Sequence, residues 1–298
     1  MAGRAALARA YLYFVVAYLA AFGAAYAVTL WLGPSAAPLR VIAWADAAAT
    51  LVVFAFSVGV NNSSVYDPYW TAAPPVIAAY LALRPESSAA PLARQILVIT
   101  LVTLWALRLT YNWVAGFQGL GHEDWRYVDF RHKTRAFYWP VSLVALHFFP
   151  TVMVYLGCLP LEPALASQHA LGPLDAVAAL VTLGGIVLEA TADAQLRAFR
   201  RSKKAPGEMM ERGLWAWSRH PNYLGEMLFW WGLFLFAIAV DPGAWKTGAG
   251  ALAITLMFVA GTIPMMEARS RKNRPEYAGL EKRVSMVFPW PPRKKAGD

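Results

Sequence analysis

The sequence predicts an all-α integral membrane protein with seven or eight transmembrane helices. Of its 298 residues, 58% are apolar and 15% are charged, whereas about a quarter are charged in ordinary soluble domains. Apolar stretches close to the roughly 20 residues needed to cross a bilayer recur along the chain. Lys and Arg are concentrated in a few connections between these stretches. These three observations favour a polytopic membrane fold.

The apolar stretches define the expected helices in chain order. They lie near residues 10–32, 39–60, 94–115, 138–159, 174–195, 222–240 and 246–266. A shorter piece at 70–83 contains Pro74 and Pro75, so it is either an eighth, tilted span or a re-entrant segment. The first stretch lacks a clear small-residue cleavage site and is too long for a signal peptide, so we expect it to remain as a helix.

The distribution of basic residues predicts the orientation. The connections 122–137 and 196–221 and the tail 267–298 are rich in Lys and Arg, whereas loops 160–173 and 241–245 contain none. Because cytoplasmic loops carry the Lys and Arg excess, we expect the basic segments and the C-terminus in the cytoplasm, in a bacterial inner membrane. Arg4 and Arg9 predict the same for the N-terminus, which requires an even number of spans and favours counting 70–83.

The net charge of +9 is then mainly a topology signal, with anionic lipid headgroups as partners. The basic residues border apolar spans and form no soluble face, so we expect no nucleic-acid partner. No obligate protein partner is indicated. The single cysteine, Cys158, lies in an apolar span and suggests neither a disulfide nor a metal cluster. We expect one transmembrane domain over 1–298, with a lipid- and substrate-facing half to about residue 90 and a cofactor-binding half over 91–298.

The most informative motif runs from Gly213 to Glu226 at the start of an apolar helix. Ionisable residues in the bilayer are costly and usually mark a function. An aromatic belt with a snorkelling arginine would explain the aromatic residues and the cation. That alternative leaves out Asn222 and Glu226, which lie at i and i+4 on one helix face. We therefore expect a pocket for a large polar cofactor, formed here by Trp215, Arg219, His220, Asn222, Tyr223 and Glu226.

A second polar run, 189–204, precedes that motif. Its members Glu189, Asp193, Arg197 and Arg200 fall at i, i+4, i+8 and i+11, on a single helix face. An Asp193–Arg197 ion pair and a positive-inside anchor formed by Arg200, Arg201, Lys203 and Lys204 are the alternatives. Neither alternative explains carboxylates two turns inside a span. A cofactor with ribose hydroxyls and phosphates explains both the carboxylates and the arginines.

A third group of candidates lies between residues 105 and 131 and in the tail. Arg108 lies inside an apolar run and shares a helix face with Asn112. The run after His122 could hold a metal, but neighbouring residues on a helix diverge, so we expect no metal site. The remaining cofactor candidates are Glu123, Asp124, Arg126, Tyr127, Glu267 and Tyr277.

The segment 61–70, Asn-Asn-Ser-Ser-Val-Tyr-Asp-Pro-Tyr-Trp, is Asn-rich and broken by proline, so it predicts a loop. It contains no Lys or Arg and places Tyr66, Asp67 and Tyr69 beside an apolar helix. A plain turn and the wall of a substrate pocket are both compatible with this composition.

Several of these motifs resemble the DUF1295 family, which is related to the steroid 5-alpha-reductases. The resemblance rests on Glu189-x3-Asp193, Gly213-Leu-Trp215, Arg219-His-Pro-Asn-Tyr-x-Gly-Glu226, Trp105-x2-Arg108-x3-Asn112 and Glu123-Asp-Trp-Arg-Tyr127. It implies a membrane reductase that holds NADPH in its C-terminal helices. Asp193 with Arg200 matches the aspartate and arginine spacing of the steroid reductases, and Asn222 with Glu226 matches their Asn-x-x-Gly-Glu contact.

One feature departs from the steroid reductases. Those enzymes carry a Gln-Glu pair on the second helix that polarises the substrate ketone. The corresponding stretch here, Trp44 to Thr50, contains Asp46 but no such pair. The cofactor half therefore matches better than the substrate half.

These observations lead us to expect an oxidoreductase that uses NADPH to reduce an activated C=C bond in a lipophilic enone. A donor must polarise the carbonyl oxygen, and a phenol, with a reference pKa of about 10, stays protonated at neutral pH. Tyr66 and Tyr69 are the expected donors, with Asp67 and Asp46 behind them. The alternatives are an S-adenosylmethionine-dependent lipid methyltransferase, which needs fewer cations, and a non-enzymatic scaffold.

Overall fold

The computed structural model describes residues 3–202 and 207–293. Lys203 and Lys204, expected near a cofactor phosphate, lie outside the described residues. The chain packs as two compact units, Met1–Ala170 and Leu171–Asp298. The division by packing therefore falls at residue 170, whereas the division of substrate and cofactor functions near residue 90 stays a prediction.

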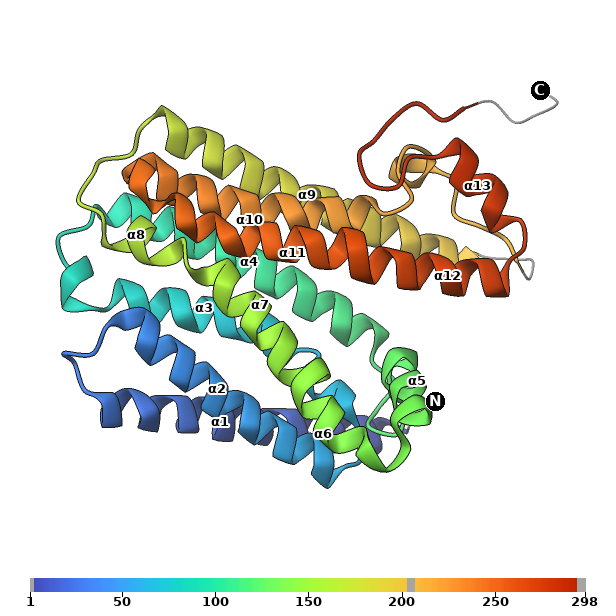
Figure 1. Cartoon of the computed structure of the whole chain (residues 1–298), viewed down its shortest axis with the longest axis horizontal. Helices are drawn as coiled ribbons and strands as arrows, with labels where there is room; N and C mark the ends of the chain where they lie inside the picture. Colours follow the sequence, from blue (N-terminus) through green and yellow to red (C-terminus); the bar gives the residue numbers. More distant parts are fainter. Residues whose placement is uncertain (1–2, 203–206, 294–298) are drawn as a thin grey trace. The chain divides into compact units, whose positions relative to one another are not determined.

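The first unit is a bundle of helices joined by short turns (Figure 1). The 3₁₀ turn Ser63–Tyr66 precedes its third helix, and a π-helical segment, Leu143–Phe148, joins the sixth to the seventh. Its helices are α1 (Arg4–Leu32), α2 (Pro38–Gly59), α3 (Tyr69–Ala82), α4 (Leu92–Gly116), α5 (Trp125–Thr134), α6 (Tyr138–Ser142), α7 (Phe149–Cys158) and α8 (Leu161–Ala166).

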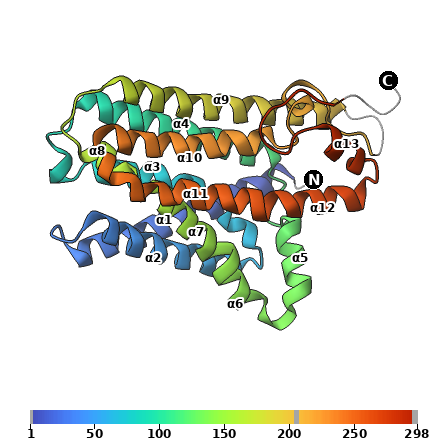
Figure 2. The same ribbon diagram turned by 45° about the horizontal axis from the view of Figure 1, so that its top comes forward.

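In the second unit, α9 (Pro173–Ser202) and α10 (Pro221–Val240) pack against each other, and both run lengthwise across the view in Figure 2. A π-helical segment, Met257–Thr262, makes α11 and α12 nearly continuous. The helices of this unit are α9 (Pro173–Ser202), α10 (Pro221–Val240), α11 (Ala249–Leu256), α12 (Ile263–Asn273) and α13 (Tyr277–Arg283).

Seven helical segments of the described chain are long and apolar enough to cross a membrane. They are Arg4–Leu32, Pro38–Gly59, Leu92–Gly116, Trp125–Ala166, Pro173–Ser202, Pro221–Val240 and Pro242–Asn273. The expected spans are confirmed, and the protein is an all-α integral membrane protein. The piece expected at 70–83 is α3, a helix of 14 residues that contains both prolines.

The connection 61–70, expected as a loop, contains the 3₁₀ turn and the first residues of α3. The connection 122–137 contains the ten-residue helix α5. Asp124 explains where α5 begins, because its side chain accepts a hydrogen bond from the backbone N–H of Arg126 and so caps the helix.

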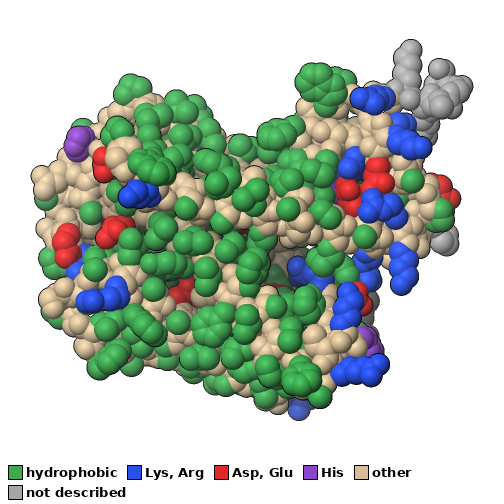
Figure 3. All heavy atoms as spheres, in the orientation of Figure 1, with side chains coloured by type: hydrophobic (Ala, Val, Ile, Leu, Met, Phe, Trp, Pro, Cys, Tyr) green, Lys and Arg blue, Asp and Glu red, His purple; other side chains and the backbone are tan. Residues whose placement is uncertain are grey.

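Helix α1 shows how the first unit meets lipid. Its buried residues Ala10, Phe14, Ala17 and Ala21 form a narrow stripe of mostly small side chains. Small residues let helices approach closely in membranes. Large apolar side chains such as Leu19 and Trp31 point outward, with exposed fractions of 69% and 79%. Figure 3 shows a broad hydrophobic surface, while acidic and basic side chains gather over α12 and α13.

The α9–α10 pair depends on glycine at its closest approach. A Cβ atom added to Gly185 would lie 2.6 Å from the carbonyl oxygen of Gly225 and 2.8 Å from the backbone nitrogen of Phe229. A Cβ atom added to Gly225 would lie 2.6 Å from the Cβ atom of Glu189. Gly232 is equally confined by Thr182. The backbones therefore pack directly against each other, and this fixes which residues of α9 face α10.

We predict that Gly185→Ala destabilises the protein by about 1–3 kcal/mol, as overpacking of a filled interface does. Gly184→Ala is the matched control, because its Cβ meets nothing within 4 Å and alanine is intrinsically better than glycine in a helix. Denaturant unfolding in detergent measures both variants. Equal stability of the two would contradict the close approach described here.

Candidate functional site

An apolar pocket in the first unit is lined by two buried polar side chains, Asp46 and Tyr69. The pocket has a volume of about 330 Å³ and lies among α1, α2 and α3. Its walls include Phe22, Val41 and Ile77, and its polar members include Asp46 and Tyr69. This mostly apolar lining suits a lipophilic molecule that carries a polar group.

The two polar side chains are bonded to each other. The Tyr69 hydroxyl donates a hydrogen bond to Oδ1 of Asp46 at 2.6 Å. Oδ2 of Asp46 is buried and has no hydrogen-bond partner among the described residues. A buried polar atom without a partner costs free energy unless a ligand or water satisfies it. The pair therefore places a carboxyl group and a phenol in the pocket wall.

Tyr66 belongs to a neighbouring cluster of buried hydroxyl groups. Its hydroxyl lies 2.7 Å from Oγ1 of Thr151, which lies 2.8 Å from Oγ1 of Thr50. Burial raises the pKa of the Tyr66 phenol well above its ordinary value. Tyr66 does not line the pocket, although its ring lies 5.6 Å from that of Tyr69. The structure thus distinguishes Tyr69, which lines the pocket, from Tyr66, which does not, although the sequence made both equal candidates for the proton donor.

Asp67, the third catalytic candidate, is bonded to the Tyr127 hydroxyl. Burial raises the pKa of this carboxyl to about 6, and the nearby Arg126 charge works against that rise. Asp67 is not among the residues that line the pocket. In this position it connects the segment before α3 to α5.

The charged candidates around α5 make similar connections within the first unit. Oε1 of Glu123 accepts a hydrogen bond from the Ser63 backbone at 2.8 Å and pairs with Arg131 at 3.2 Å. Asp124 pairs with Arg126 at 2.8 Å. Burial alone would raise the pKa of Asp124, but its hydrogen bonds and charge interaction with Arg126 outweigh burial and lower it. Cofactor binding by these residues stays a prediction.

Arg108 and Asn112 lie one turn apart on α4, as their spacing predicts, and both are partly buried. They belong to the first unit. The other predicted cofactor residues, from Glu189 onward, belong to the second.

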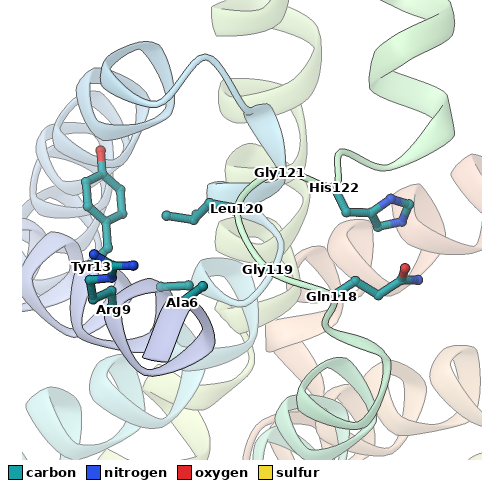
Figure 4. Close-up of a pocket in the computed structure, with 9 residues that line it drawn as sticks. Ala6, Arg9, Tyr13, Gln118, Gly119, Leu120, Gly121 and His122 are labelled. Carbon is teal, nitrogen blue, oxygen red and sulfur yellow. The ribbon is translucent and has the colours of Figure 1, made fainter. Parts of the chain in front are cut away.

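A second hollow in the first unit, of about 590 Å³, lies between the start of α1 and the loop 118–122. Figure 4 shows Leu120 pointing toward α1, whereas Gln118 and His122 point away from it. Arg9 and Tyr13 complete the α1 side, and the lining includes no carboxylate. This hollow offers no donor–acceptor pair like that of Asp46 and Tyr69.

In the second unit, α9 carries the predicted face of charged residues. Glu189 and Asp193 are buried, with exposed fractions of 5% and 8%. Arg197 is partly buried and Arg200 is exposed. The face therefore runs from buried carboxylates to accessible guanidinium groups, as its spacing predicts.

The segment Gly213–Ala216 folds onto the end of α9. Gly213 has φ of +58°, a left-handed conformation that favours glycine, and an added Cβ would meet the Gln195 side chain. Gln195 accepts a hydrogen bond from the Leu214 backbone at 3.0 Å. The Trp215 indole donates to the Ala192 carbonyl oxygen at 3.0 Å. Trp215 therefore positions the segment that leads into α10.

Arg219 holds the C-terminal segment in place. Its Nε donates to Oε1 of Glu267 at 2.8 Å, and its Nη1 donates to the carbonyl oxygens of Glu281 and Val284. His220 Nε2 lies 3.1 Å from the same Glu267 oxygen. These contacts give Arg219, His220 and Glu267 a structural role, while cofactor binding by them stays a prediction.

The start of α10 contains the remaining candidates. Oδ1 of Asn222 is buried without a hydrogen-bond partner among the described residues. Glu226 accepts a hydrogen bond from the Trp230 indole at 2.9 Å. The Tyr223 ring stacks on His220 and on Phe258. Asn222 is thus the residue of this helix that offers an open acceptor to a ligand.

Tyr277, at the start of α13, is 7% exposed and packs with Leu280 and Val284. Burial raises the pKa of its phenol to about 12. Its hydroxyl therefore stays protonated at neutral pH.

The first unit also contains a set of buried polar side chains that were not predicted from the sequence as site residues. They are Ser57, Ser63, Ser142, His147 and Thr151, each with an exposed fraction of 5% or less. A signal was available for two of them, because His147 and Thr151 lie one helical turn apart inside an apolar run.

Comparison with known families identifies the chain. The family described as "Protein of unknown function (DUF1295)" matches residues 53–284. The chain belongs to the DUF1295 family. The match includes Tyr66, Tyr69 and every predicted cofactor residue, whereas Asp46 precedes it.

A similar sequence is the "Uncharacterized protein C594.04c" of Schizosaccharomyces pombe. It is 28% identical, with the alignment covering 80% of this chain and 76% of the yeast protein. No solved structure matches this DUF1295 chain significantly.

We predict that Arg219→Gln lowers the stability of the cofactor-free protein by about 3–5 kcal/mol, because it leaves the buried Glu267 carboxylate without its charged partner. Arg271→Gln is the control, since its ion pair with Glu281 involves an arginine side chain that is 47% exposed and exposed pairs contribute only about 0–1 kcal/mol. Urea unfolding in detergent compares them. Small and equal losses of stability in the two variants would contradict the structural role of Arg219.

Proposed function

We propose that this protein is a membrane oxidoreductase that uses NADPH to reduce an activated C=C bond in a lipophilic carbonyl compound, as its resemblance to the steroid 5-alpha-reductases implies. One observation carries the proposal: the hydrogen-bonded Asp46–Tyr69 pair lines the apolar pocket of the first unit. A mostly apolar pocket with such a pair in its wall suits a lipophilic substrate whose carbonyl oxygen needs a hydrogen-bond donor.

In this reaction the apolar and polar residues of the pocket would have different roles. The apolar walls bind and orient the body of the substrate and exclude water. The Tyr69 phenol, once its O–H turns from Asp46 to the substrate, or a proton on Oδ2 of Asp46, would donate to the carbonyl oxygen and stabilise the enolate as negative charge develops there. Protonation at the α-carbon completes the reduction. Asp46 thereby supplies the carboxyl group that the Gln-Glu pair of the steroid reductases would otherwise provide.

The second unit offers groups that fit NADPH. Oδ1 of Asn222 is a buried acceptor without a partner, and the α9 carboxylates Glu189 and Asp193 are acceptors for ribose hydroxyls. Arg197 and Arg200 lie one to two turns further along α9, where guanidinium groups can pair with phosphates. NADPH would supply the hydride, and the residues named here would bind and orient the cofactor.

The proposal also includes the location of the protein and excludes a rival enzyme class. We assign the protein to a bacterial inner membrane, with the basic connections and the C-terminus in the cytoplasm, from the distribution of Lys and Arg. An S-adenosylmethionine-dependent methyltransferase is the rival enzyme class. The arginines of α9 argue against it, because that cofactor has no phosphate.

We expect NADPH to bind more than about tenfold tighter than NADH, because Arg200 and Arg201 can pair with the additional phosphate. Asn222→Ala should weaken NADPH binding and leave the melting temperature of the cofactor-free protein nearly unchanged. Asn273→Ala, an exposed asparagine of the same unit, is the control. Calorimetric titration with NADPH, NADH and S-adenosylmethionine measures these affinities. Stabilisation by S-adenosylmethionine alone would support the methyltransferase instead.

We expect Tyr69→Phe and Asp46→Asn to lower enone reduction by about 10²-fold or more, in line with losing a general acid, while NADPH binding is kept. Tyr13→Phe is the control. It removes a phenol that donates to the Phe56 carbonyl oxygen at 2.7 Å and lies outside this pocket. Turnover of hydrophobic enones in detergent or nanodiscs is the readout. Full activity of both Tyr69→Phe and Asp46→Asn would remove the pair from the chemistry.

A further inference from the structure

Buried polar side chains in the first unit form a chain that begins near its surface. The Glu123 side chain is 13% exposed and pairs with Arg131. Its Oε1 accepts a hydrogen bond from the Tyr138 hydroxyl at 3.3 Å. The Tyr138 hydroxyl lies 2.6 Å from Oγ of Ser63, which lies 2.9 Å from Oγ of Ser142. Three hydroxyl groups thus follow one another inward from a carboxylate that water reaches.

The inner end of this chain is His147. Its Nδ1 lies 3.5 Å from Oγ and 2.9 Å from the carbonyl oxygen of Ser142, and its Nε2 lies 3.1 Å from Oγ of Ser57. Ser63, Ser142 and His147 are each fully buried. His147 belongs to the π-helical segment Leu143–Phe148, and such segments are rare and frequently occur at functional sites.

His147 adjoins the hydroxyl cluster beside the pocket. The Tyr66 ring meets the imidazole edge-on with centroids 5.1 Å apart. The Thr151 hydroxyl donates to the His147 carbonyl oxygen at 2.9 Å and is bonded to Tyr66. Thr50, the other partner of Thr151, lies one turn from Asp46 on α2. The chain from the surface therefore ends next to the groups that surround the Asp46–Tyr69 pair.

We propose that Glu123, Tyr138, Ser63, Ser142 and His147 form a proton path from the surface of the first unit to the hydroxyl groups beside the pocket. Every member can both give and receive a proton. One proton enters at Glu123 from water, and each hydroxyl passes its own proton inward as it receives another. Nδ1 of His147 faces the Ser142 carbonyl oxygen at 2.9 Å and so already carries a proton. The imidazole therefore has to turn: it releases that proton toward Tyr66, and its other nitrogen takes the next proton from Ser142. No electron moves.

The path deepens the proposed reductase function and rests on it for its purpose, because each reduction consumes one proton inside an apolar pocket. Hydroxyl groups that only cross-link helices would show the same static contacts. The two roles differ in how fast a proton at His147 exchanges with water, and this rate can be measured without any substrate.

The test labels the five histidines with ¹⁵N and follows exchange of the His147 ring N–H with water by NMR in nanodiscs. Ser63→Val and Ser63→Thr have nearly the same shape, but only threonine keeps the hydroxyl. We expect Ser63→Val to slow exchange by more than about tenfold, because exchange then requires local opening of the structure. Ser63→Thr should stay close to the unchanged protein.

Equal exchange rates in the valine and threonine variants would overturn the path. If Ser63→Val does not fold, Tyr138→Phe removes the next hydroxyl toward the surface, and unchanged exchange in that variant overturns the path as well. Enone turnover is measured in the same samples. Absence of turnover in the unchanged protein, with the exchange difference present, would refute the reductase function and leave the path standing.

Discussion

A polar side chain held away from water must find a partner inside the protein, and this constraint organises both units. In a membrane the constraint is strict, because lipid offers neither donors nor acceptors. The first unit satisfies it with Asp46 and Tyr69, with Tyr66, Thr151 and Thr50, and with a line of groups that ends at Glu123. These buried polar side chains therefore lie in one region of the first unit, whereas others, such as Arg94 and Ser87, bond to backbone carbonyl oxygens elsewhere in it.

In the second unit, close helix packing decides which polar side chains are buried, and Arg219 then supplies partners for some of them. Gly185 and Gly225 let the backbones of α9 and α10 touch, and this approach fixes the position of Glu189 and Asp193 on the buried side of α9. The Arg219 guanidinium then ties the start of α10 to Glu267 and to the carbonyl oxygens before the C-terminal segment. Removing either the glycines or the arginine would disturb the geometry around Asn222.

Each unit also contains a buried acceptor atom without a hydrogen-bond partner among the described residues, and the surroundings of the two acceptors differ. Asp46, whose Oδ2 has no partner among the described residues, lines an apolar pocket, whereas Asn222, whose Oδ1 likewise has none, lies on the helix that begins after Arg219 and carries Glu226. An acceptor in an apolar pocket suits a lipophilic molecule, and one on a helix with charged neighbours suits a large polar cofactor. This contrast is why we propose a substrate site in the first unit and a cofactor site in the second.

The sequence alone determined the fold class, the seven apolar spans and the helical face from Glu189 to Arg200, because hydropathy and helical periodicity are local properties. Only the tertiary structure paired Asp46 with Tyr69, 23 residues away, and Arg219 with Glu267, 48 residues away. It also placed Tyr69, but not Tyr66, in the pocket wall. These outcomes depend on how helices rotate and pack against one another, and spacing along the chain does not encode that rotation.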